Sequence, residues 1–183
     1  MDPVLSERTV RNLSAAFHRA ASASLVRHAG HQCAIAPSSA AWSEPKSGGR
    51  ILLMTISSFT FRLIAVFQVA DGQATRDYYT AGGAEKTLDE TFSEFANMCC
   101  GALGRELFSQ FRHIGMSIPY LLEWQCARHL QDLNPRMISS YDITIDNAAR
   151  VKATLCMCCA RQVEFAPPVI EAAQTTGGEL ELL

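Results

Sequence analysis

Residues 88–111 have the sequence LDETFSEFANMCCGALGRELFSQF. Its large apolar residues recur at steps of three or four, which is the spacing of one face of an α-helix. We therefore predict a helix over about residues 87–112, with one apolar stripe that packs on a sheet. The stripe comprises Leu88, Phe92, Phe95, Cys99, Leu103 and Leu107.

The opposite side of this predicted helix carries polar residues and glycines. Glu94 and Asn97 lie three residues apart, so their side chains project side by side. Glycine inside a helix lowers the stability of the helix by roughly 1 kcal/mol relative to alanine. Core packing does not demand small residues on an exposed side. Two interpretations fit: Glu94 and Asn97 are solvated residues and the glycines are tolerated, or another surface approaches closely there. The residues of this side are Glu90, Glu94, Asn97, Gly101 and Gly104.

A β-hairpin is predicted upstream of the helix. Residues 51–69 are nearly all β-branched, aromatic or aliphatic, with a polar break at Ser57 and Ser58. That composition favours strands near 50–57 and 59–70, joined by a short reversal. The preceding segment, residues 36–49, is rich in Ser, Pro and Gly, so we expect a loop there.

A second hairpin is predicted downstream of the helix. Apolar and polar residues alternate over 141–146, a turn is expected at 147–150, and the alternation resumes over 151–157. The strand region 137–146 is also a candidate sheet edge. Two hairpins and two long helices predict an α+β fold, with helices packed on a largely antiparallel sheet.

The N-terminal segment is predicted to form an amphipathic helix over about residues 3–29. Asp2 with Pro3, or Ser6 with Glu7, can open this helix, and Gly30 can close it. His28 and His31 would then lie at the helix end, where cations interact favourably with the helix dipole. We expect residues 1–183 to form a single domain, with a tail over about 174–183.

Composition excludes several classes of protein. Hydrophobic residues make up 48% and charged residues 19% of the chain, which is typical of a globular protein. The net charge of −2 gives no electrostatic reason to expect nucleic acid as a partner. The sequence shows neither a secretory signal nor an apolar run of about 18 residues, which predicts a cytoplasmic protein without a membrane span.

The run Glu94-Phe-Ala-Asn97-Met-Cys-Cys-Gly101 resembles the signature helix of the CheC/CheX/FliY chemotaxis phosphatase family, which reads Glu-x-x-Asn-Met-x-x-Gly. Downstream, Ile114-Gly-Met-Ser-Ile-Pro119 resembles the segment ending in Ser-x-Pro that follows this helix in CheX-like proteins. The sequence departs from the family pattern in carrying Glu90 where Asp or Ser is common. No second Glu-x-x-Asn copy is present, so CheX is the nearer relative.

The resemblance implies a phosphatase that acts on the aspartyl phosphate of a CheY-like response regulator. Glu94 and Asn97 would be the catalytic pair: Asn97 orients the attacking water, and Glu94 docks a lysine of the partner. Glu90, Met98 and Gly101 would contact the partner. The chain itself would bind no cofactor or metal, Mg²⁺ being held by the partner receiver domain, and a homodimer is possible.

Two other functions are compatible with the sequence. The same fold serves for assembly in FliM, so a non-catalytic binding or structural protein of the chemotaxis or flagellar switch is an alternative to the enzyme. A metal site is suggested by Cys156, Cys158 and Cys159, but alternation along a strand would point Cys159 away from the other two. It is also suggested by His28 and His31, three residues apart, for which a role at the helix end is the preferred interpretation. Cys99 lies on the core stripe, which argues against a nucleophilic cysteine beside Asn97.

Overall fold

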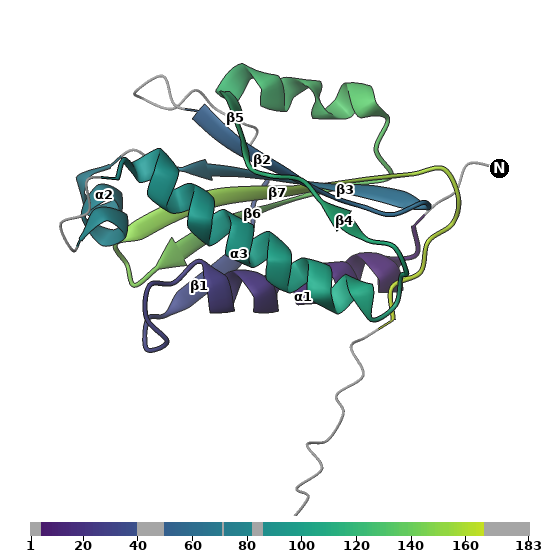
Figure 1. Ribbon diagram of the computed structural model, residues 1–183, viewed down its shortest axis with the longest axis horizontal. Coiled ribbons are helices and arrows are strands. Elements are labelled where there is room, and N and C mark those ends of the chain that lie inside the picture. Colours follow the sequence, from purple (N-terminus) through teal and green to yellow (C-terminus); the bar gives the residue numbers. More distant parts are fainter. Residues whose placement is uncertain (1–4, 40–49, 71, 82–85, 167–183) are drawn as a thin grey trace, which may run out of the picture.

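The centre of the molecule is one seven-stranded sheet (Figure 1). The computed structural model describes residues 5–39, 50–70, 72–81 and 86–166. The strands are β1 (Cys33–Pro37), β2 (Arg50–Ser57), β3 (Phe61–Val69), β4 (Gly115–Met116), β5 (Tyr120–Glu123), β6 (Met137–Ile145) and β7 (Ala149–Cys159). Their spatial order is β1-β6-β7-β3-β2-β4, β5 also pairs with β2, and all pairs are antiparallel.

Helices cover both faces of this sheet unequally. They are α1 (Glu7–Ser24), α2 (Gln73–Thr80), α3 (Leu88–Phe108) and the 3₁₀ helix η1 (Trp124–Leu133). Figure 1 shows α1 and α3 together on one face and η1 on the other. The larger apolar core lies under α1 and α3, and a smaller one lies under Trp124, Ala127 and Leu130. The predicted α+β class, with helices packed on an antiparallel sheet, is confirmed.

Both predicted hairpins are present. Strands β2 and β3 are joined by a tight turn in which the amide of Ser58 donates to the carbonyl of Phe61 at 2.9 Å. Strands β6 and β7 are joined through Asp146 and Asn147, whose φ angles of 51° and 54° lie in the left-handed region that Asp and Asn tolerate. Strand β7 begins at Ala149, so the turn comes earlier than residues 147–150.

The N-terminal helix is shorter than the predicted range of 3–29. It begins after Ser6, whose hydroxyl accepts from the amide of Thr9 at 3.1 Å, and it ends at Ser24. Gly30 therefore does not close the helix, and a C-terminal capping role for His28 and His31 is wrong. The imidazole Nδ1 of His31 instead lies 2.7 Å from the hydroxyl of Tyr78.

Other differences concern short elements with weak sequence periodicity. Five elements were not predicted: β1, α2, η1, β4 and β5. Strand β1 ends at Pro37, inside the start of the predicted loop 36–49. Strand β6 pairs with β1 on one side and β7 on the other, so the prediction of an edge at 137–146 is wrong. Residues 40–49 and the predicted tail at 174–183 lie outside the described residues.

None of the helices in the described part of the chain has both the length and the apolar character needed to cross a bilayer.

Candidate functional site on helix α3

The inner side of α3 fixes the helix on the sheet. Phe92, Cys99, Leu103 and Leu107, four of the six predicted stripe residues, are buried, whereas Leu88 and Phe95 are half-buried. Ala96 and Cys100 are buried as well. Because so much apolar surface is removed from water, the orientation of α3 about its own axis is strongly determined.

The N-terminus of α3 is closed by a capping box. The hydroxyl of Thr87 accepts from the amide of Glu90 at 3.2 Å, and the carboxylate of Glu90 accepts from the amide of Thr87 at 2.8 Å. The hydrogen bond from the Thr87 amide lowers the pKa of Glu90. An ion pair between Asp89 and Arg50 joins the same turn to β2. Glu90 thus has a structural role, and its contact with a partner stays a prediction.

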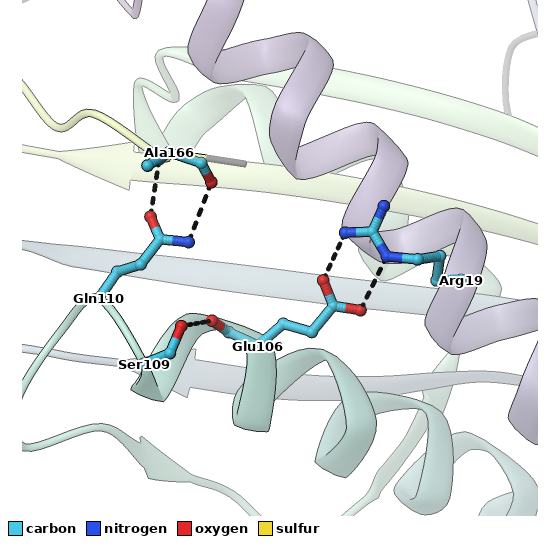
Figure 2. A network of polar contacts seen from close by, with 5 residues as sticks. All are labelled: Arg19, Glu106, Ser109, Gln110 and Ala166. Atoms are coloured by element: carbon cyan, nitrogen blue, oxygen red, sulfur yellow. Dashed lines mark hydrogen bonds and ion pairs between the residues drawn. The ribbon is translucent and has the colours of Figure 1, made fainter. Parts of the chain in front are cut away.

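Polar contacts also fix the C-terminal end of α3 (Figure 2). The carboxylate of Glu106 accepts two hydrogen bonds from the guanidinium of Arg19 on α1, at 3.2 and 2.5 Å. Just past the helix, the carboxamide of Gln110 accepts from the amide of Ala166 at 2.7 Å and donates to its carbonyl at 3.0 Å. These contacts join α3 to α1 and to the segment that follows β7.

The outer side of α3 presents Glu94 and Asn97 to solvent, as the helical spacing predicted, and Met98 is exposed beside Asn97. Glu94 accepts a hydrogen bond at 2.6 Å from the ammonium of Lys86, with both side chains more than half exposed. The hydrogen bond to Glu94 raises the pKa of Lys86. The carboxamide of Asn97 has no hydrogen-bond partner among the described residues, so its donors and acceptor are open to solvent.

The two glycines of α3 leave space above the helix. A Cβ at Gly101 would meet only the Nη1 of Arg105, at 3.7 Å, and a Cβ at Gly104 would meet nothing within 4 Å. The described part of the molecule therefore does not require glycine at either position. That result fits the hypothesis that a second surface, outside this chain, approaches α3 at these positions.

Two large apolar side chains are exposed on α3. Met98 is 50% exposed and Phe108 is 63% exposed. Met98 lies between Asn97 and Gly101 along the chain, so polar and apolar groups alternate over a short distance. Such a mixture is typical of surfaces that bind another protein.

The cysteines near Asn97 are unsuited to nucleophilic chemistry. Cys99 and Cys100 are buried, and burial raises the pKa of the Cys100 thiol to about 12 and that of Cys99 well above its ordinary value. A thiol rather than a thiolate is therefore present near neutral pH. The sequence-based argument against a cysteine nucleophile gains a physical reason.

The C-terminal cysteines do not converge. Cys156 and Cys158 pack on the side of the sheet that carries η1, whereas Cys159 packs against the larger core, as strand alternation predicted. Within residues 5–39, 50–70, 72–81 and 86–166, no three His, Cys, Asp or Glu side chains gather in a way that would hold a metal ion.

Sequence reasoning missed two residues that act on the site. Thr87 had a usable signal, because Thr-x-x-Glu ahead of an apolar helix is the pattern of a capping box. Lys86 has no such signal in the sequence. It lies eight residues before Glu94 and outside the helix, so helical spacing does not connect the two side chains.

The sheet order and the position of α3 define a fold shared with CheX proteins, CheC-like proteins and the middle domain of FliM. CheX from Vibrio vulnificus is 12% identical, with a TM-score of 0.54 over 80% of this chain and 96% of that one. CheX in the CheX–CheY–BeF3–Mg²⁺ complex from Borrelia burgdorferi is 8% identical, with a TM-score of 0.55 over 81% and 97%.

The FliM middle domain from Vibrio alginolyticus is 9% identical, with a TM-score of 0.50 over 80% of this chain and 92% of that one. No protein-family model and no curated protein matches the sequence. At these identities the likeness establishes the fold, and the activity has to be argued from the residues of α3.

Proposed function

We propose that this protein is a phosphatase of the CheX type, which removes the phosphoryl group from an aspartyl phosphate of a CheY-like response regulator. The observation that carries the proposal is the pair Glu94 and Asn97, side by side and exposed on the outer side of α3 in a CheX-like fold. Support also comes from the Borrelia burgdorferi CheX structure, which was solved in complex with CheY, BeF3 and Mg²⁺.

Asn97 is assigned the orientation of the attacking water. Its carboxamide offers one acceptor and two donors, so it can hold a water in line with the phosphorus, but it cannot take up a proton as a general base. Transfer of a phosphoryl group to water depends chiefly on such positioning and on compensation of the phosphoryl charge. The Mg²⁺ and a lysine of the partner receiver domain are expected to supply that compensation.

Glu94 is assigned the docking of the partner lysine. A carboxylate–ammonium contact gains strength when water is excluded at an interface. In the free protein the ammonium of Lys86 already lies 2.6 Å from Glu94, which supports the assignment of this exposed carboxylate as an acceptor for a lysine. Met98 and Gly101 are expected to lie in the same interface, Met98 as an apolar contact and Gly101 as the point of closest approach.

The proposal is tested by phosphate release from a panel of phosphorylated receiver domains. Asn97→Ala should bind the phosphorylated partner as wild type does, but dephosphorylation should slow to the partner's own rate of hydrolysis. Asn97 is exposed and makes no hydrogen bond with the described residues, so the thermal stability of this variant should be unchanged. Undiminished phosphatase activity of Asn97→Ala would refute the assignment.

Glu94→Lys separates docking from chemistry. It should lower both the affinity for a receiver domain loaded with BeF3 and Mg²⁺ and the turnover of the phosphorylated form, because two ammonium groups would then face each other. A titration that finds the same affinity for Glu94→Lys as for wild type would contradict the docking role.

A non-catalytic binding protein of the chemotaxis or flagellar switch is the second candidate, favoured by the likeness to the FliM middle domain. The two candidates differ in one result. A binding protein would associate with a receiver or switch component without accelerating phosphate release, whereas the phosphatase would accelerate it.

Cytoplasmic location and homodimer formation complete the proposal, since two-component receivers act in the cytoplasm. If the sheets of two copies pair, the strands open to pairing among the described residues are β1 on one side and β4 and β5 on the other. Strand β6, the edge expected from the sequence, already has two neighbours.

A further inference from the structure

A hollow with a volume of about 420 Å³ lies at the end of the sheet where β2 turns into β3. Its walls come from that turn, from the end of β7 and from the segment that leaves η1. Volumes of this size are typical of sites for small molecules. The hollow is separate from the outer side of α3, because Arg62 projects from β3 on the sheet face that carries η1.

The register of the strands aligns three of the lining residues in one row across the sheet. Ser57 on β2 is opposite Arg62 on β3, and Arg62 is opposite Cys158 on β7. Arg136, whose amide donates to the carbonyl of Met157 at 2.7 Å, lines the hollow from the next segment. Two arginines thus line one hollow, Arg62 from β3 and Arg136 from the segment just before β6.

The end of η1 forms another part of the wall, next to Cys158. Asn134 adopts a left-handed conformation with φ of 49°, which turns the chain out of η1, and Leu133 accepts from the thiol of Cys158 at 3.8 Å. Asn134 brings a carboxamide to the wall. Backbone geometry rather than a flexible side chain alone therefore shapes this side of the hollow.

The charged side chains that line the hollow are all positive. Among the described residues that line the hollow there is no Asp or Glu, and Arg62 makes no ion pair with any described residue. The hydroxyls of Ser57, Ser58 and Thr60 add neutral hydrogen-bond donors. A guanidinium offers a planar fork of donors that matches phosphate oxygens, and a cleft lined by one sign of charge concentrates the opposite ion.

We propose that this hollow, centred on Arg62 and Arg136, is a binding site for a small ligand that carries a phosphate group. The phosphate would lie between the two guanidinium groups, with the turn hydroxyls donating to its remaining oxygens. Phe59, 89% exposed at the rim, offers a flat ring on which an aromatic part of a phosphate ester can stack. The site would act independently of the chemistry proposed for α3.

The test is a calorimetric titration of the full chain at constant ionic strength with two probes, inorganic phosphate and adenosine monophosphate. Saturable binding of at least one probe is expected, and Arg62→Gln should weaken it roughly tenfold through loss of a charge-assisted hydrogen bond. Arg8→Gln is the matched control. It removes the same charge from an exposed position on α1, across the sheet, and should leave the affinity unchanged.

The two probes distinguish free phosphate from a phosphate ester. Tighter binding of adenosine monophosphate, with the difference removed by Phe59→Ala, identifies an aromatic phosphate ester. Equal binding of both probes, unaffected by Phe59→Ala, identifies phosphate alone. The proposal is overturned if neither probe binds saturably, or if Arg62→Gln binds as wild type does. Neither result bears on the Asn97 assay.

Discussion

The two sides of helix α3 differ in what holds each residue in place. The inner side consists of side chains that are buried in the larger core, such as Phe92 and Leu103. The outer side consists of Glu94, Asn97 and Met98, which the described structure leaves in solvent. The inner side therefore sets the orientation of the helix, while the outer residues are free to be selected for what they contact outside the chain.

The largest effect is expected from the inner side. Leu103→Ala should lower the free energy of unfolding by about 2–5 kcal/mol, because it removes buried methyl groups and leaves a cavity under α3. Chemical denaturation at neutral pH measures this loss. Met98→Ala is the matched control on the outer side, where truncation of a half-exposed side chain should change stability by only about 0.5 kcal/mol. Equal losses for the two variants would contradict the division between the sides.

The capping box links the two sides, because it fixes where the helix begins. Thr87→Ala should cost about 0.5–2 kcal/mol of stability, since the amide of Glu90 loses its acceptor. Ser93→Ala is the control: its hydroxyl donates to the carbonyl of Asp89 within the helix, and alanine there should be neutral or stabilising. An equal loss in Ser93→Ala would show that the capping geometry is unimportant.

The capping box also predicts a pH dependence. The pKa of Glu90 is lower in the folded chain than in the unfolded chain. Its stabilising contribution is therefore complete above the unfolded pKa and is lost as the pH falls through the folded pKa. Denaturation curves of wild type and Glu90→Gln should converge at acidic pH. A constant difference between them down to acidic pH would exclude this linkage.

The elements with strong periodicity were predictable from sequence. Helix α3 and the hairpin β6–β7 each carry a clear apolar period, and the hairpin β2–β3 carries a long apolar run with a polar break at its turn. Strands β4 and β5 are short and pair with β2 far away in the sequence, so no local pattern marks them. The end of α1 at Ser24 likewise escaped prediction, because no glycine or proline stands there.

The candidate site was predictable only in part. The exposure of Glu94 and Asn97 follows from helical phase, and the structure agrees with it. The contact of Lys86 with Glu94 and the row formed by Ser57, Arg62 and Cys158 depend on where other segments lie in space. Such contacts are tertiary, and spacing along one element does not contain them.

Substitution of a glycine on the outer side of α3 should affect the stability of the free protein and its affinity for a receiver domain in opposite directions. Gly101→Ala should stabilise the free protein by about 0.5–1 kcal/mol, since the added Cβ meets only Arg105 at an ordinary distance. The same Cβ should weaken the complex with a BeF3-loaded receiver by roughly tenfold if the partner backbone approaches there. Gly104→Ala should give the same gain in stability, and its affinity reports how far the interface extends along α3.

The smallest effect is expected from Lys86, which competes for Glu94 in the free protein. Removing its ammonium in Lys86→Ala should strengthen receiver binding by a factor below about five, because exposed ion pairs contribute little and are screened by salt. The gain in affinity should shrink as ionic strength rises and should vanish in the double variant with Glu94→Gln.

The control is Lys152→Ala, which removes an ammonium from β7 instead of from the neighbourhood of Glu94. It should leave the affinity for the receiver unchanged. If Lys86→Ala instead weakened binding, Lys86 would be a contact of the partner rather than its competitor, and the surface that binds the partner would extend past the N-terminus of α3 to a residue that lies outside the helix.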